Sequence, residues 1–359
     1  MTRILLIRLR LIGDVVFTTP IPRALKRMFP DARVTYLVEP DAAPVVAGNP
    51  HLDEVLVVPR GRGISRLAGD LRLARRLRRE RFDLVIDLHG GPRSSWLTLA
   101  TAAPERIGYT ITGRGWMYTR TVHRPRELRA RHSVVNQWDL LRAIDGWPAG
   151  EPDRLRDGVE MPRNAAAEAS IATRLTGAGV EPGDELIVVH VSAGNPFRRW
   201  PEAAFTRLVV GLAGGSSKRR IVLSSGPSDA GAAARIAEAA RGELGGHGVR
   251  IVAFGDFDLP ELRALVARSR LFVGGDTGPL HIAATTTTPI VGIYGPTLPA
   301  RSAPWRDPAV PTESVEVAGL PCRPCDQRIC EPGDFRCLTT LKPAEVLSAA
   351  ERMMTRPRR

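Results

Sequence analysis

Residues 273–284 read Val-Gly-Gly-Asp-Thr-Gly-Pro-Leu-His-Ile-Ala-Ala, and apolar runs at 271–274 and 289–294 flank the turn they contain. A strand, a glycine-rich turn and a helix start form the usual site for a phosphorylated ligand, because glycines admit close backbone approach and the helix start offers unpaired N–H groups. Asp276, Thr277 and His281 add hydrogen-bonding side chains. The pattern is equally typical of a tight turn with Asp276 or Thr277 as the N-cap.

The alternation seen around this turn continues along the chain. Short β-branched runs, each followed by a helical stretch or a turn, lie at 4–7, 34–38, 55–58, 83–87, 186–190, 220–224, 250–254, 271–274 and 290–294. A helix is expected over 14–28. Leu67, Leu71, Ala74 and Leu77 fall at helical spacing with arginines on the opposite face. Such a βαβ rhythm predicts parallel, doubly wound sheets.

A stretch rich in Gly, Pro, Asp and Arg at 145–165 interrupts this alternation of strands and helices. Such a composition is typical of a connection between domains. We therefore expect an α/β protein of two Rossmann-like, doubly wound halves with a cleft between them. The expected divisions are an N-terminal domain at 1–160, a linker region at 161–180, a C-terminal domain at 181–340, and a C-terminal helix and basic tail at 341–359. Ligands of such sheets bind outside the carboxyl ends of the strands.

The formal net charge of +13 indicates an anionic partner, although part of this excess reflects a general use of arginine. Aromatic residues make up only 5%, and no nucleic-acid-binding module is recognisable, so nucleic acid is not the expected partner. The sequence starts directly on a strand without a signal layout, and no apolar run reaches about 18 residues. We expect a cytoplasmic protein that can touch a membrane surface peripherally.

In the first half, Arg8-Leu-Arg10-Leu-Ile-Gly-Asp14 ends the first strand. A carboxylate that follows a glycine and opens a helix is favoured by the helix dipole alone, which is the structural interpretation of Asp14. The functional interpretation is a general base, with Arg8 and Arg10 nearby to bind an anionic acceptor. The loop lacks Gly-x-Gly-x-x-Gly, which disfavours a nicotinamide or flavin enzyme.

In the second half, Ser192 and Arg198 lie in the loop that follows the strand ending at His190, and Asp229 follows a later strand. Arginine binds phosphate with two parallel hydrogen bonds, so Arg198 is a candidate phosphate ligand. A solvent-exposed arginine pair is the alternative. Asp229 is a weaker candidate for binding ribose hydroxyls.

Four cysteines, Cys322, Cys325, Cys330 and Cys337, lie within sixteen residues. Four thiols can close a zinc or iron–sulfur site, but only one pair here has the Cys-x2-Cys spacing of such sites. We therefore expect no metal ion, and interpret the cysteines as small residues that hold a loop in place.

Taken together, these motifs resemble glycosyltransferase family 9, the ADP-heptose:lipopolysaccharide heptosyltransferases. The resemblance extends over nearly the whole chain. It rests on the opening segment 4–33, Leu37-Val-Glu-Pro, Gly48-Asn-Pro, Phe82-Asp-Leu-Val-Ile-Asp-Leu-His-Gly, Arg198-Arg-Trp-Pro, Gly275-Asp-Thr-Gly-Pro-Leu-His-Ile-Ala and the tail from Pro321 to Cys337.

The resemblance implies a GT-B fold and inverting, metal-independent transfer of a heptose from ADP-heptose to an anionic, lipid-linked inner-core acceptor, with no cofactor. Asp14 would be the base, and Arg8 and Arg10 would face the acceptor. The implied donor-binding residues are Ser192, Arg198, Asp229, Asp276, Thr277, Gly278 and His281. Family members usually carry Lys where this chain has Arg198, and Glu where it has Asp229, so this chain departs from the family pattern at both positions.

Three alternatives stay open at this point. A GT-B transferase could use another nucleotide-sugar in a different glycan pathway. A non-catalytic basic protein could bind nucleic acid or an anionic glycan, but mere binding needs no base such as Asp14. A metal-dependent protein could be organised around the cysteines. The sequence does not indicate an oligomeric state.

Overall fold

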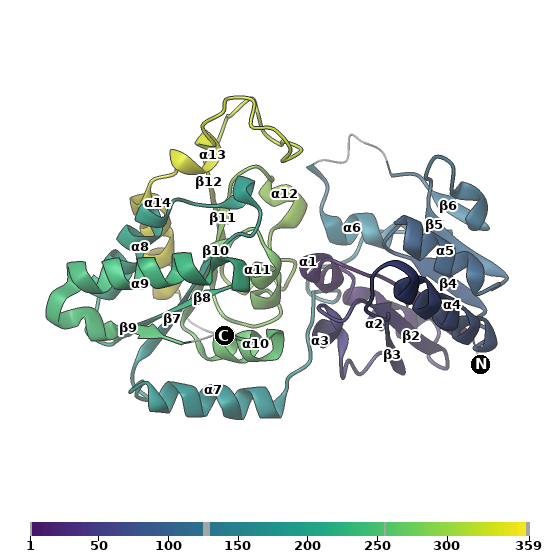
Figure 1. Cartoon of the computed structure of the whole chain (residues 1–359), viewed down its shortest axis with the longest axis horizontal. Coiled ribbons are helices and arrows are strands. Elements are labelled where there is room, and N and C mark those ends of the chain that lie inside the picture. The colour runs from purple at the N-terminus through teal and green to yellow at the C-terminus, as the bar shows by residue number, and fades with distance from the viewer. Residues whose placement is uncertain (1, 125–129, 255, 357–359) are drawn as a thin grey trace. The chain divides into compact units, whose positions relative to one another are not determined.

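The computed structural model describes residues 2–124, 130–254 and 256–356. The chain forms two compact units that divide between Pro162 and Arg163. Each unit contains one six-stranded sheet (Figure 1), and every strand pairing is parallel. Within the described ranges, no helix is both long and apolar enough to cross a membrane.

The N-terminal unit carries the sheet of order β3-β2-β1-β4-β5-β6. Its strands are β1 (Arg3–Ile7), β2 (Arg33–Val38), β3 (Glu54–Val57), β4 (Leu84–Asp87), β5 (Glu105–Tyr109) and β6 (Arg120–Val122). Its α-helices are α1 (Ile12–Val16), α2 (Pro20–Met28), α3 (Ala43–Val46), α4 (Gly63–Arg79), α5 (Pro92–Ala100) and α6 (Ser133–Trp138). β1 and β4 are neighbours in this sheet, and the chain leaves them toward opposite sheet edges, so their carboxyl ends mark the point where a ligand site is expected.

The C-terminal unit repeats the same strand order, as β12-β11-β10-β7-β8-β9. Its strands are β7 (Glu185–Val191), β8 (Arg219–Ser225), β9 (Ile251–Ala253), β10 (Leu271–Gly275), β11 (Ile290–Tyr294) and β12 (Thr312–Glu316). Its α-helices are α7 (Ala165–Gly177), α8 (Glu202–Gly214), α9 (Ala230–Leu244), α10 (Leu259–Arg268), α11 (Gly278–Ala283), α12 (Pro299–Ser302), α13 (Arg336–Thr339) and α14 (Pro343–Thr355). The corresponding neighbours here are β7 and β10.

Apolar strand residues form the core of each unit. In the C-terminal unit, α8, α9 and α14 pack on one face of the sheet and α7, α10 and α11 on the other (Figure 1). Val346 and Met353 of α14 are almost fully buried in this core, and the ion pair between Arg219 and Glu351 holds the helix in place at 2.6 Å. The central strands are buried on both faces, and this explains why their sequences are continuous apolar runs.

The predicted doubly wound α/β fold is confirmed, with three differences in detail. The helix expected over 14–28 is interrupted between α1 and α2, because Pro20 lacks an N–H and its ring cannot be accommodated inside a helix. Strands β5, β6 and β12 were not predicted, since β5 contains a glycine and charged residues and the other two are short or half-exposed edge strands.

The orientation of α4 also differs from the expectation. Leu67 and Leu71 were expected on the same face as Ala74 and Leu77, opposite the arginines. In the structure, the buried face contains Leu73, Ala74 and Leu77, whereas Leu67 and Leu71 are exposed. The face of α4 that packs on the core therefore excludes Leu67 and Leu71, with which the predicted pattern begins.

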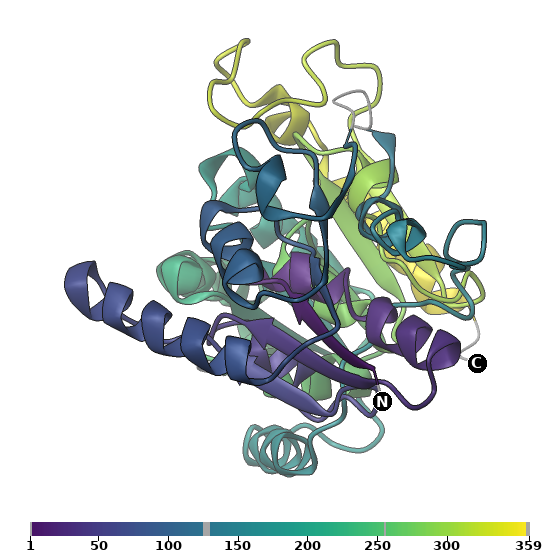
Figure 2. The same ribbon diagram turned by 90° about the vertical axis from the view of Figure 1, so that its right-hand side faces the viewer.

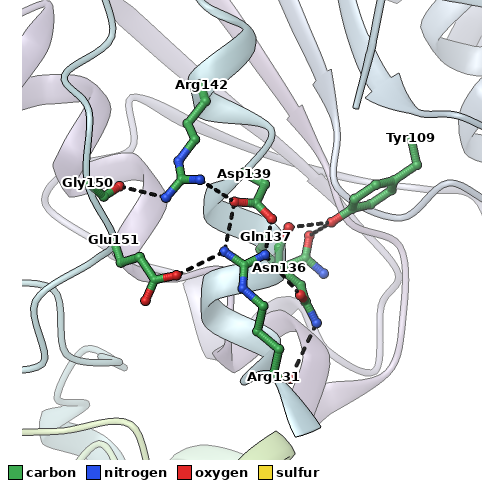
Figure 3. Close-up of polar contacts among 8 residues, drawn as sticks. All are labelled: Tyr109, Arg131, Asn136, Gln137, Asp139, Arg142, Gly150 and Glu151. Carbon is green, nitrogen blue, oxygen red and sulfur yellow. Dashed lines mark hydrogen bonds and ion pairs between the residues drawn. The ribbon is translucent and has the colours of Figure 1, made fainter. Parts of the chain in front are cut away.

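A polar network holds α6 to the remainder of the N-terminal unit (Figure 3). The guanidinium of Arg131 binds both Asp139 and Glu151, and Arg142 donates to the carbonyl oxygen of Gly150 at 3.0 Å. On the sheet side, the hydroxyl of Tyr109 donates to buried Gln137 at 3.0 Å. The contact of Tyr109 with Gln137 satisfies buried polar groups and the others link the two ends of α6 to the chain around it, so we interpret the network as structural.

Candidate active site

Asp14 lies in the first turn of α1, just beyond the carboxyl end of β1. Its carboxylate forms an ion pair with Arg8, whose side chain is only 8% exposed, while that of Asp14 is 35% exposed. Arg8 also donates to the carbonyl oxygen of Leu88, which follows β4, at 2.7 Å. The structure thus places Arg8 behind Asp14, with its guanidinium directed to protein atoms, and leaves Asp14 partly open to solvent.

Arg10 is exposed and lines a pocket of about 730 Å³ at the carboxyl ends of β1 to β4. The pocket is strongly basic. Its charged lining residues are Arg10, Arg60, Arg62, Arg66 and Arg93 together with Glu39 and Asp41. Both carboxylates lie near arginines, since Asp41 is 2.7 Å from Arg60 and Glu39 is 3.8 Å from Arg93. A multiply anionic ligand fits this charge distribution.

His89 contributes a neutral group to the same pocket. Burial lowers the pKa of its imidazole, and the positive charges of Arg8 and Arg10 lower it further, against the effect of Asp87 and Asp14. Its Nδ1 is buried with no hydrogen-bond partner in the described part of the chain. Asp87, fully buried, fixes the backbone here by accepting from the N–H groups of His89 and Gly90, both at 2.9 Å. His89 can therefore offer an uncharged hydrogen-bond acceptor among arginines.

In the C-terminal unit, Asp276 follows β10 and is the centre of a buried cluster. Its Oδ1 lies 3.4 Å from Nε2 of His281, and its Oδ2 accepts from the hydroxyl of Thr297 at 2.5 Å. Burial opposes ionisation, but the contacts with His281, Arg198 and Thr297 lower the pKa of Asp276 to about 2. Asp276 is therefore a carboxylate that holds its neighbours in position.

Arg198 is one of those neighbours. Its Nη1 donates to the backbone oxygen of Asp276 at 2.7 Å and lies 3.5 Å from Oδ2 of that residue. Its Nε donates to Gln327 at 2.6 Å, and Asn195 donates to the same Gln327 oxygen at 3.1 Å. The side chain is 29% exposed, so a fixed cation faces solvent at the end of β10.

Thr277 and Gly278 form the turn between β10 and α11. Thr277 is the N-cap residue of α11, but its side chain makes no capping hydrogen bond. Its hydroxyl instead donates to the carbonyl oxygen of Gly275 at 3.3 Å. The interpretation of Asp276 or Thr277 as an N-cap side chain therefore does not account for this turn.

Ser192 and Asp229 line one pocket of about 390 Å³ together with Arg199 and Trp200. Asp229 is buried and lies 3.8 Å from the guanidinium of Arg199. The hydroxyl of Ser192 is buried with no partner among the residues the structure describes. A Cβ at Gly275 would lie 3.5 Å from this hydroxyl, so the pocket adjoins the Asp276 cluster.

The four cysteines are free thiols in the segment that supplies Gln327. Burial raises the pKa of the Cys337 thiol to about 11. Across the described ranges, no three His, Cys, Asp or Glu side chains form a group that could hold a metal ion. The N–H group of Cys325 donates to the carbonyl oxygen of Pro296 at 3.3 Å, which ties the segment to the end of β11. The rings of Phe197 and Phe335, with centroids 5.3 Å apart, tie it to the loop after β7.

Each unit thus brings its own candidates together, Asp14 with Arg8 and Arg198 with Asp276 and His281. Sequence reasoning missed His89, Gln327 and Thr297. His89 could have been found, because it follows a buried strand in the same way as Asp14 does. Gln327 has no local signal, since it contacts a residue 129 positions away.

Comparison with known proteins gives a consistent result. The family glycosyltransferase family 9 (heptosyltransferase) matches residues 71–331. A curated relative, lipopolysaccharide heptosyltransferase 3 from Escherichia coli, is 26% identical over 351 residues, covering 96% of this chain and 97% of the relative.

Solved structures show the same fold. A glycosyltransferase of family 9 from Veillonella parvula superposes with a TM-score of 0.80 at 24% identity, covering 98% of this chain and 97% of that one. An Escherichia coli heptosyltransferase solved with ADP-2-deoxy-2-fluoro heptose has a TM-score of 0.68 at 20% identity, covering 98% of this chain and 99% of that one.

Proposed function

Because this chain belongs to glycosyltransferase family 9, the heptosyltransferases, and has the GT-B fold, we propose that it transfers a heptose from ADP-heptose to an anionic inner-core sugar of lipopolysaccharide. The proposal includes inversion at the anomeric carbon and no requirement for a metal ion. In it, the N-terminal unit binds the acceptor and the C-terminal unit binds the donor.

The observation that carries the proposal is the setting of Asp14, a partly exposed carboxylate held by buried Arg8 at the carboxyl end of a central strand. Asp14 takes the proton of the acceptor hydroxyl, and that oxygen attacks the anomeric carbon. The bond from the anomeric carbon to the diphosphate oxygen breaks, and ADP leaves with the bonding electrons. Arg8 acts on Asp14 as a positioning residue, because its guanidinium is already occupied by protein oxygens.

The leaving diphosphate gains charge as the bond breaks, so catalysis needs a fixed positive group beside it. Arg198 fits this role because hydrogen bonds to Asp276 and Gln327 fix the direction of its guanidinium. The turn Thr277-Gly278 offers backbone N–H groups, and His281 completes the diphosphate and sugar site. Asp229 and Ser192 in the adjoining pocket suit the nucleoside.

The basic pocket around Arg10 suits an acceptor that carries carboxylates and phosphates. Arginines in this pocket can only donate hydrogen bonds, whereas His89 can also accept one from a sugar hydroxyl. The neutral form of His89 is favoured by its lowered pKa. A lipid-linked acceptor would place the enzyme at the inner face of the plasma membrane, where the anionic sugar is presented.

The experiment that tests the proposal replaces the base without changing its shape. We expect Asp14→Asn to lower the rate of heptose transfer from ADP-heptose to O-deacylated inner-core oligosaccharide by about 10²- to 10⁴-fold, the usual contribution of a general base. ADP affinity, measured by calorimetry, is expected to stay within about threefold, because that site belongs to the other unit.

Asp31→Asn is the matched control, since Asp31 is an exposed aspartate of the same unit. This variant should transfer at the wild-type rate. Transfer by Asp14→Asn within tenfold of wild type would exclude Asp14 as the base. No transfer by the wild-type chain, with ADP bound normally, would exclude the proposed sugar or acceptor.

A further inference from the structure

Helix α4 presents apolar side chains to solvent. Ile64 is 86% exposed, Leu67 60% and Leu71 40%. Their spacings of three and four residues place them on one face of the helix. A different face of the helix contains Leu73 and Leu77, which are buried in the core of the N-terminal unit. The exposed residues therefore form a separate apolar stripe, which we call the α4 stripe.

Contacts on the packed face keep the α4 stripe turned outward. Asp70 accepts from Nη2 of Arg93 at 2.5 Å and from its Nε at 3.1 Å. Gly69 lies so close to Pro59 that an added Cβ would come within 2.9 Å of the proline ring. Because the helix is anchored by an ion pair and by close packing, it cannot roll to bury the stripe.

Arginines surround the α4 stripe. Arg75 and Arg78 extend it along the same face, Arg72 and Arg79 lie beside it, and Arg76 lies further round the helix, all of them exposed. Arg76 pairs with Glu54 at 2.7 Å. The other four have no ion-pair partner in the part of the chain that the structure describes. Aliphatic side chains flanked by unpaired arginines are typical of helices that lie in the interface of an anionic membrane.

The start of α4 borders the basic pocket. Arg62, its N-cap residue, and Arg66 line that pocket. Figure 2 shows the long blue helix α4 at the margin of its unit. A surface that lay along α4 would therefore also lie beside the pocket that we assign to the acceptor.

We propose that α4 docks on an anionic lipid surface, with Ile64, Leu67 and Leu71 inserted among the acyl chains and the arginines on the headgroups. The choice of partner follows from charge complementarity. A second copy of α4 would bring like charges together, and a neutral surface would leave the arginines uncompensated. The inference deepens the proposed function, because a lipid-linked acceptor is presented on such a surface.

The test measures binding to vesicles without any transfer reaction. Wild-type protein is cosedimented with vesicles of equal parts phosphatidylglycerol and phosphatidylcholine, and the triple variant I64S/L67S/L71S is compared with it. We expect the triple variant to bind at least tenfold more weakly. Its transfer to the water-soluble, O-deacylated acceptor should stay within about twofold of wild type, since none of the three residues lines the pocket.

The matched control is L155S/V249S/I329S, which removes three other exposed aliphatic side chains, 71%, 82% and 77% exposed. It should bind vesicles as wild type does. R75Q/R78Q tests the charge, with an expected loss of about fivefold for each arginine removed, corresponding to about 1 kcal/mol per basic residue near an anionic surface. Added salt should weaken wild-type binding.

Three results would overturn the proposal. One is wild-type vesicle binding by the triple variant. Another is equal binding of wild type to pure phosphatidylcholine. The third is a change of sedimentation mass in I64S/L67S/L71S without lipid, which would make the α4 stripe a contact between protein chains. If the protein bound vesicles through α4 but transferred no heptose, the docking proposal would stand and only the proposed reaction would be rejected.

Discussion

At the scale of single residues, the two candidate arginines have different surroundings. Arg8 is buried, and its partners, Asp14 and the carbonyl oxygen of Leu88, are protein atoms. Arg198 is held from behind by Asp276 and Gln327 but stays partly exposed. An arginine with its geometry fixed in advance loses less conformational freedom when phosphate binds, so the second arrangement suits a ligand-binding cation.

The hydrogen bond from Arg198 to Gln327 leads to a testable prediction. Gln327→Ala removes the acceptor that fixes Nε of Arg198 at 2.6 Å. We expect ADP to bind about tenfold more weakly, because hydrogen bonds to charged groups contribute about 1.5–3 kcal/mol. Isothermal titration calorimetry with ADP measures the change.

Ile329→Ala serves as the control in the same segment, because Ile329 is 77% exposed. Its ADP affinity should match that of wild type. If Gln327→Ala also matched wild type, Gln327 would have no positioning role, and Arg198 would be held by Asp276 alone.

At this scale the sequence predicts less than at the scale of the fold. Asp14, Arg198 and Asp276 stand out because each follows an apolar strand, which is local information. The contact of Arg8 with the carbonyl oxygen of Leu88, and that of Asp276 with Thr297, depend on which strands become neighbours. Local pattern does not encode that order, so these contacts between protein groups could not be predicted from the sequence.

At the scale of elements, the central strand β7 contains a buried histidine. His190 is 4% exposed, and one of its ring nitrogens lies 3.0 Å from the hydroxyl of Ser224. Burial lowers the pKa of His190 to about 4. In the unfolded chain a histidine titrates near 6.5, so the unfolded state takes up a proton at a higher pH than the folded state does.

This difference predicts a loss of stability in mild acid. As pH falls from about 6.5 to about 4, the unfolded state gains a proton that the folded state excludes, so the free energy of unfolding falls by on the order of 3 kcal/mol in total. Denaturant unfolding at pH 7 and pH 5 should show about 2 kcal/mol more loss for wild type than for His190→Asn.

His247→Asn, an exposed histidine of the same unit, is the control and should retain the wild-type pH dependence. Identical pH dependence of wild type and His190→Asn would show that His190 titrates normally in the folded protein.

The positions of the strands were easier to predict from the sequence than the face of a helix that is buried. Buried parallel strands are apolar on both sides, so β1, β4, β7 and β10 stand out in the sequence. In α4, leucines occur on two sides of the helix, so periodicity alone allows more than one buried face. Asp70, whose partner Arg93 comes from another helix, lies on the buried face. The ion pair between Asp70 and Arg93 cannot be predicted from the sequence before the fold is known.

At the scale of the whole molecule, two units with the same strand order carry two different sets of polar residues. The net charge of +13 implies that polyanions bind the chain non-specifically at low salt. Discrimination among nucleotides is therefore best measured at an ionic strength that screens exposed charges.

Under these conditions we expect ADP and ADP-sugars to raise the melting temperature more than UDP or GDP derivatives do. A ligand at one hundred times its Kd stabilises the folded state by about 2.7 kcal/mol, which corresponds to roughly 5–10 °C for a unit of this size. Inorganic diphosphate is the control for charge alone. Stabilisation by a UDP-sugar only would overturn the proposed donor and favour a transferase of another pathway.

The Asp276 cluster also bears on how fast a donor can bind. The turn after β10 is tied to Thr297, His281 and Arg198 by contacts within the protein itself. A site already in its working shape needs no slow rearrangement on encounter, and its affinity is not reduced by the cost of ordering a loop. Donor capture should therefore be limited by diffusion and orientation, and exchange of ADP for a fresh donor should depend on how quickly ADP dissociates.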